Sequence, residues 1–102
     1  MGGSIGDAVL SEGEIRTHLG DLPGWRYLAR ALHKEFRYKG FRASIAFVNR
    51  MAEQASAAGH HPDIEIHVNR VIVSLTTHDA GGVTAKDVEL ARAIERVAEP
   101  DA

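Results

Sequence analysis

Cysteine is absent from this 102-residue chain, so neither disulfide bonds nor thiolate chemistry is available to it. No apolar run approaches the roughly 20 residues of a membrane span, and residues 1–9 lack the basic and apolar blocks of a signal peptide. The formal net charge of only −2 gives no electrostatic basis for binding nucleic acid or an anionic membrane. Together these absences favour a cytoplasmic protein that binds neither nucleic acid nor membranes.

What is present fits one ordinary globular domain. Hydrophobic residues make up 44% of the chain and charged residues 25%, and the length is sufficient for a single core. We expect the glycine-rich residues 1–10 to form a flexible tail and residues 11–98 to form the domain.

Three helices are predicted. Ser11 with Glu14, and Thr84 with Asp87, each place a hydroxyl residue three positions before a carboxylate, which is the capping box that begins a helix. From about residue 40 to residue 58, apolar residues recur at helical spacing. This apolar stripe consists of Phe41, Ile45, Val48, Ala52 and Ala55, flanked by Phe47, Met51 and Ala58.

Two further stretches alternate with the period of a β-strand. Residues 25–38 predict two strands with a break near Arg30-Ala31, and residues 64–76 predict a hairpin whose two-residue loop is Asn69-Arg70. The order α-β-β-α-β-β-α predicts an α+β fold: a four-stranded antiparallel sheet, built from two β-hairpins, with helices packed on one face.

Three histidines fall near one end of the second hairpin. With the loop at Asn69-Arg70, the numbers of facing residues sum to 139, so His61 would lie opposite His78 just beyond the strands. His60 adds a third imidazole at the same end. His18, His33 and His67 belong to no such cluster.

Three interpretations of this cluster are open: an accidental meeting of surface residues, a zinc site, or a site of acid–base chemistry. Imidazole suits proton transfer near neutral pH and also binds zinc. Pro62 biases His61 toward extended backbone, where the side chains of His60 and His61 point to opposite faces and cannot easily hold one ion. The pattern therefore favours acid–base catalysis without a metal.

The same run resembles the pterin-4a-carbinolamine dehydratase family, also called the dimerisation cofactor family. The family signature is a charged residue, three residues, His-His-Pro, five residues, an aromatic residue, nine residues, His, and Asp after eight or more. His60-His61-Pro62, His78 and Asp87 match it, whereas Ser56 occupies the charged position and Val68 the aromatic one.

This resemblance implies the same α+β fold, assembled as homodimers or homotetramers, and a small pterin substrate. The implied reaction removes water from a 4a-hydroxytetrahydropterin and needs no cofactor. Because the predicted register brings His61 and His78 face to face, we assign the proton transfers to them. His60 is the third member, which orients the substrate or serves as an alternate acid. The resemblance further implies a pterin-binding site near Pro62, Trp25, Asp87, Ser56 and Val68. Burial in the core would explain Trp25 equally well, and helix capping alone would explain Asp87.

The two departures leave a second function open. Ser56 lies four residues before His60, where a carboxylate on the same side of a helix would favour the imidazolium. Val68 supplies apolar bulk but no ring. The alternative is a non-catalytic, dehydratase-like scaffold that binds protein, because relatives in the resembled family include a dimerisation cofactor of a transcription factor and a Rubisco assembly factor of carboxysomes.

Overall fold

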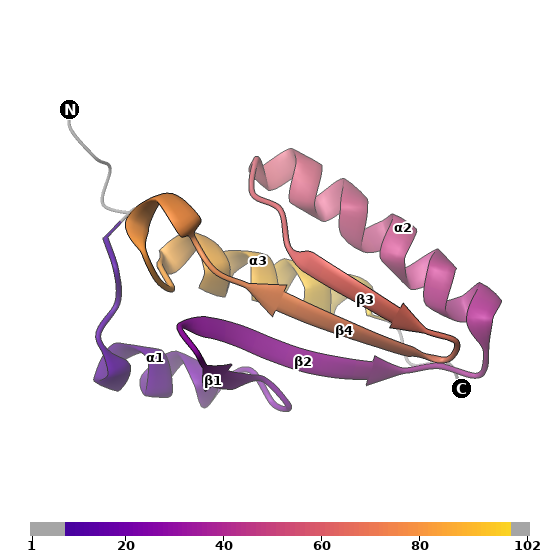
Figure 1. The fold of residues 1–102 in the computed structure, drawn as a ribbon, viewed down its shortest axis with the longest axis horizontal. Helices are drawn as coiled ribbons and strands as arrows, with labels where there is room; N and C mark the ends of the chain where they lie inside the picture. The colour runs from indigo at the N-terminus through magenta and orange to yellow at the C-terminus, as the bar shows by residue number, and fades with distance from the viewer. Residues whose placement is uncertain (1–7, 99–102) are drawn as a thin grey trace.

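Residues 8–98 are described by the structure, a computed structural model (Figure 1). Its elements are α1 (Glu12–Leu19), β1 (Arg26–Leu28), β2 (Ala31–Arg37), α2 (Phe41–Ala58), β3 (Asp63–His67), β4 (Arg70–Leu75), the short 3₁₀ helix η2 (His78–Ala80) and α3 (Ala85–Val97). The four strands form one antiparallel sheet in the order β1-β2-β4-β3. The predicted α+β class, with two β-hairpins and the order α-β-β-α-β-β-α, is confirmed.

Both predicted capping boxes are present. In α1, the Ser11 N–H donates to Glu14 Oε1 at 2.8 Å, and the Glu14 N–H donates to Ser11 Oγ at 3.1 Å. In α3, the Thr84 N–H donates to Asp87 Oδ2 at 2.9 Å, and the Lys86 N–H donates to Thr84 Oγ1 at 3.2 Å. These side chains satisfy backbone groups that the first turn of a helix leaves unpaired.

Backbone hydrogen bonds to the rest of the domain begin before residue 11, where the sequence predicted the domain to start. Val9 forms an antiparallel bridge with Thr84, and the Leu10 N–H donates to the Val83 carbonyl at 2.9 Å. These bonds hold residues 9 and 10, which were expected in a flexible tail, beside the start of α3. Residues 1–7 of the expected tail lie outside the described residues.

The core lies between the sheet and the helices, with α3 behind the sheet in Figure 1. It is built from side chains that alternate along β2 and β4 and recur at helical spacing along α2 and α3. These buried side chains include Leu32, Phe36, Val71, Val73, Leu75, Phe47, Met51, Val88, Leu90 and Ile94.

The buried face of α2 differs from the predicted stripe. Its fully buried line is Ser44, Phe47, Met51 and Ala55, whereas Phe41 is 57% exposed and Ala52 is also exposed. Phe47 and Met51 are the bulkiest apolar residues near the helix centre, so turning them toward the sheet buries more apolar area than the predicted centre line would. No helix among residues 8–98 is both long and apolar enough to cross a membrane.

The register of the second hairpin also differs from the prediction. Ile66 pairs with Val71 and Ile64 with Val73, so the loop is Val68-Asn69 and the numbers of facing residues sum to 137. Both registers keep the same residues on the same face, because side chains alternate with period two. Alternation therefore could not distinguish them, and the observed loop places Val68 at a positive φ of 56°, which is uncommon for a β-branched residue.

The first hairpin turns at Ala29-Arg30, one residue before the predicted break. Both turn residues have positive φ, 53° and 63°, as the common two-residue hairpin turns require. Neither is glycine, asparagine or aspartate, so the sequence contained no clear sign of this turn.

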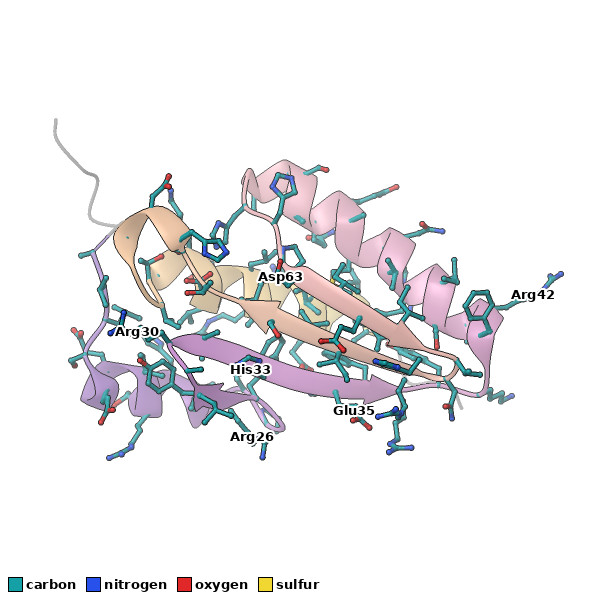
Figure 2. The ribbon with its side chains drawn as sticks, in the orientation of Figure 1. Arg26, Arg30, His33, Glu35, Arg42 and Asp63 are labelled. Carbon is teal, nitrogen blue, oxygen red and sulfur yellow. The ribbon has the colours of Figure 1, made fainter. Side chains whose placement is uncertain are left out.

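Among residues 8–98, no helix covers the second face of the sheet, where polar side chains lie among the apolar Leu28, Ala31 and Ile72. Figure 2 shows Arg26, His33 and Asp63 on this face, and the register places them in one row with Ser74. Because the Leu28 carbonyl can only accept, His33 donates to it through Nε2 at 2.9 Å, and Nδ1 accepts from Ser74 Oγ at 2.9 Å. His33 therefore has a structural role on the open face.

Candidate active site

Three histidines line one cleft at the end of the second hairpin. His60 follows α2, His61 precedes β3, and His78 begins η2 after β4. The cleft has a volume of about 330 Å³ and is lined by Gly59, His60, His61, Thr76, Thr77, His78, Asp79 and Lys86. The structure thus brings together the three imidazoles that the sequence singled out.

The reason for their proximity is not the predicted register. The observed ladder ends at Asp63 and Ser74, and extending it outward would place His61 opposite Thr76 rather than His78. His78 instead reaches the cleft through the loop of residues 77–82, which folds back on itself. In that loop the Thr77 N–H donates to the Gly82 carbonyl at 3.0 Å.

His60 is held by a buried carboxylate. Its Nε2 lies 2.6 Å from Asp87 Oδ1, and the side chains are 13% and 0% exposed respectively. The other oxygen of Asp87 accepts from the Thr84 N–H at 2.9 Å and from Thr77 Oγ1 at 2.8 Å. Burial of a carboxylate is costly unless donors surround it, and these three contacts supply them.

Asp87 therefore has two roles at once. It caps α3, as the sequence predicted, and it also orients the imidazole of His60. An imidazole that donates Nε2–H to a carboxylate keeps Nδ1 as the nitrogen available to a molecule in the cleft.

None of the five residues predicted to bind substrate is among those that line the cleft, and three of them lie well away from the histidines or in the core. Trp25 is buried in the core at 4% exposure, and its Nε1 donates to Glu95 Oε2 at 2.8 Å. Val68 is 66% exposed at the opposite end of β3 from His61. Ser56 is exposed on the last turn of α2. Within one chain, their predicted roles gain no support from the geometry.

The predicted relation between Ser56 and His60 is also altered by the end of α2. The helix stops at Ala58, Gly59 adopts a left-handed conformation with φ 65°, and the His60 N–H donates to the Ala55 carbonyl at 3.1 Å. The chain therefore turns away before His60, and the side-by-side placement expected of residues four apart on a helix does not apply.

Pro62 is half-buried in the short segment between His61 and β3. It limits His61 to extended backbone but does not line the cleft, so a direct contact with substrate stays a prediction. Among residues 8–98, no three His, Cys, Asp or Glu side chains are arranged to hold a metal ion.

The sequence did not point to Thr77 or Lys86. Two smaller hollows, of about 280 and 240 Å³, adjoin the histidine cleft, and Lys86 lines all three. Thr77 is 7% exposed, lines the cleft and donates through Oγ1 to Asp87 Oδ2. Its position immediately before His78 was the one local sign available, whereas its contact with Asp87 depends on the tertiary fold.

A small α+β domain with three imidazoles in one cleft, one of them backed by a buried carboxylate, defines a candidate site of acid–base chemistry on a small molecule. The family model described as pterin 4 alpha carbinolamine dehydratase matches residues 8–97, and the chain belongs to this family.

Relatives of similar length support this assignment. A protein of Thermosynechococcus vestitus named "Putative pterin-4-alpha-carbinolamine dehydratase" is 51% identical over 87% of this chain and 94% of its own. A protein of the same name from Roseiflexus sp. (strain RS-1) is 50% identical over 86% of this chain and 95% of its own.

Two solved structures share the fold. The crystal structure of a transcriptional coactivator/pterin dehydratase from Brucella melitensis is 33% identical, with a TM-score of 0.85 over 89% of this chain and 99% of that one. A pterin dehydratase-like protein identified as a RuBisCO assembly factor in the alpha-carboxysome is 21% identical, with a TM-score of 0.64 over 76% of this chain and 92% of that one. At this identity the second likeness concerns the fold alone.

Proposed function

We propose that this protein is a 4a-hydroxytetrahydrobiopterin dehydratase, which removes water from the pterin 4a-carbinolamine and gives the quinonoid dihydropterin. The observation that carries the proposal is the cleft in which His60, His61 and His78 meet, with His60 hydrogen-bonded to Asp87. Membership of the family supplies the substrate class. The cytoplasm and the recycling of tetrahydrobiopterin are the proposed setting.

The reaction is an elimination that needs two proton transfers. The bond from C4a to the hydroxyl oxygen breaks, and a proton delivered to that oxygen allows it to leave as water. A second proton leaves a ring nitrogen, and its bonding electrons form the new double bond. The carbinolamine therefore gives one quinonoid dihydropterin and one water, with no net change in protons or oxidation state, so the step itself requires no cofactor.

The positions of the imidazoles suggest a division of labour. His61 and His78 both line the cleft and are exposed, so we assign the two proton transfers to them. His60 is largely buried and fixed by Asp87, which suits it to orient the pterin or to act as a further proton carrier. A positioned acid or base of this kind contributes about 10²- to 10⁴-fold to a rate.

A homodimer or homotetramer is proposed as the working assembly. Several apolar side chains are exposed on the single chain, and association would remove them from water. The most exposed of them are Phe41, Leu28, Val68 and Val9. Light scattering on the purified protein would give the assembly directly.

A second candidate function is a dehydratase-like scaffold that binds protein. The observation in its favour is that Ser56 and Val68 depart from the family signature at two of its positions. The pterin dehydratase-like protein identified as a RuBisCO assembly factor has the same fold, which supports this candidate.

A direct dehydration assay separates the two functions. Synthetic 4a-carbinolamine would be mixed with the purified protein, and formation of the quinonoid product would be followed against the spontaneous reaction. The dehydratase should accelerate the reaction in proportion to protein concentration, and the double variant His61→Ala/His78→Ala should not. A wild-type rate equal to the spontaneous rate would leave the scaffold as the better proposal.

A further inference from the structure

A pair of buried hydroxyls lies behind the Asp87–His60 contact. Thr77 is 7% exposed and Thr84 is fully buried. Thr77 Oγ1 lies 2.8 Å from Asp87 Oδ2 and also 2.8 Å from Thr84 Oγ1. Both hydroxyls are shielded from water, so each one requires a hydrogen-bond partner inside the protein.

The direction of these hydrogen bonds follows from counting protons. A carboxylate can only accept, so the single hydroxyl proton of Thr77 points to Asp87 Oδ2. The contact between the two threonines must then be donated by Thr84, whose own oxygen accepts the Lys86 N–H at 3.2 Å. The donors form one directed chain from Lys86 N–H through Thr84 and Thr77 to Asp87.

This chain fixes how Asp87 faces His60. Oδ2 is occupied by Thr77 Oγ1 and by the Thr84 N–H, whereas Oδ1 faces His60 Nε2. Because two donors fix Oδ2, the carboxylate group keeps one orientation, and Oδ1 stays directed at Nε2 of His60. Donors in a directed chain also polarise one another, which strengthens the last bond to the carboxylate.

Thr77 is joined to His78 as well as to Asp87. It immediately precedes His78, and its backbone closes the loop that carries that histidine. The Thr77 carbonyl accepts the N–H groups of Ala80 and Gly81, each at 3.0 Å, and its own N–H donates to the Gly82 carbonyl at 3.0 Å. One residue thus links the loop of His78 to the carboxylate that holds His60.

We propose that Thr77 is a positioning residue of the site: its hydroxyl holds Asp87 so that His60 keeps its proton on Nε2 and offers Nδ1 to the cleft. The same hydroxyl fixes the loop of His78 relative to His60. Its effect on the rate rests on the proposed dehydratase function, whereas its effect on the protonated nitrogen of His60 does not.

The first test replaces Thr77 with valine, which has nearly the same shape but no hydroxyl. Asp87 Oδ2 would keep one donor, and the Thr84 hydroxyl would lose its acceptor. We expect kcat for dehydration to fall by about tenfold, with a smaller change in KM, because a hydrogen bond to a charged group is lost. Thr77→Ser keeps the hydroxyl and should recover most of the rate.

The second test observes His60 directly. Nitrogen chemical shifts of ¹⁵N-labelled histidine report which ring nitrogen carries the proton. The wild-type protein at mildly alkaline pH should show His60 protonated on Nε2 alone, and Thr77→Val should shift it toward a mixture of the two tautomers. Thr17→Val is the matched control, since its hydroxyl bonds to the Gly13 carbonyl on α1, away from the cleft.

The outcomes separate the two levels of the proposal. Suppose that Thr77→Val shifts the His60 tautomer, but the wild-type protein does not dehydrate the carbinolamine. The positioning role would then be supported, and the dehydratase function would be refuted. If Thr77→Val keeps the wild-type tautomer and rate, the positioning role is refuted. Equal losses in Thr77→Ser and Thr77→Val would also refute it, because the hydroxyl would then not be the part that matters.

Discussion

Two carboxylates near opposite ends of α3 bind partners of different kinds. Asp87, in the first turn, is fully buried and lies 2.6 Å from Nε2 of His60. Glu95, near the last turn, has a side chain 29% exposed and lies 2.6 Å from Nζ of Lys34. The distances are the same, but an ammonium keeps its charge at physiological pH, whereas an imidazole gains and loses a proton near neutrality.

The surroundings of Glu95 indicate a structural contact. It accepts from Trp25 Nε1 at 2.8 Å, while Lys34 also donates to the Pro23 carbonyl at 2.8 Å and lies over the Phe36 ring. These bonds join α3 to β2 and to the loop before β1. Asp87, by contrast, holds a residue that lines a cleft. A close ion-pair geometry alone therefore does not mark a functional site, whereas the chemistry of the carboxylate's partner does.

The largest expected effect comes from Asp87→Asn. The amide can accept at one end only, so keeping the Thr84 and Thr77 bonds turns its NH₂ toward His60 and forces the proton onto Nδ1. We expect the dehydration rate to fall by about 10²-fold or more, as in other sites where the wrong tautomer is imposed. Unfolding in denaturant should also show a stability loss of about 1–3 kcal/mol. A rate within about threefold of wild type would contradict this role for Asp87.

Removing the exposed imidazoles should affect the rate without affecting stability. His61→Ala and His78→Ala are each expected to lower the dehydration rate by at least about tenfold, because each removes a proton carrier. Both side chains are exposed, so the free energy of unfolding should change by less than about 0.5 kcal/mol. His67→Ala, at the far end of β3, is the matched control. Unchanged rates in both variants, with intact circular dichroism, would remove these two residues from the mechanism.

Glu95→Gln replaces a carboxylate with an amide of the same shape, as Asp87→Asn does, but near the other end of α3. It removes the charge that Lys34 binds, in a partly exposed setting, so the stability loss should be about 1–2 kcal/mol. The dehydration rate at a temperature well below the unfolding midpoint should stay within about twofold of wild type. A rate loss comparable to that of Asp87→Asn would show that the two carboxylates do not differ in kind.

Most of the fold could be predicted because its signals are local. The capping boxes at Ser11 and Thr84 and the alternation along β4 depend only on residues close in the sequence. The hairpin register could not be fixed, because sliding the partner by two residues preserves every face. The turn at Ala29-Arg30 was equally hidden, since the surrounding sheet rather than a turn residue imposes its positive φ values.

The residues of the candidate site likewise divide into those with a local sequence signal and those whose position depends on the tertiary fold. His60, His61 and His78 were identified from residue type and from their place at the strand ends. Thr77 was missed because its contact with Asp87 joins the segment between β4 and η2 to α3, and only the fold brings these together. Trp25 was assigned to the pterin site by resemblance, and the sequence could not show that its indole would point to Glu95 in the core.

The smallest effect is expected at Ser56, where the structure changes the meaning of a departure from the family signature. If His60 continued the helix, a glutamate at position 56 would lie beside its imidazole. Because α2 ends at Ala58 and Gly59 turns the chain, an exposed side chain at position 56 is directed mainly to solvent. Ser56→Glu should therefore change the rate by no more than about twofold, the size of a weak, screened pair. The measurement is the pH–rate profile of the two proteins in parallel at low and moderate salt. A tenfold rise at low salt that salt abolishes would mean that a charge at this position does interact with the imidazoles.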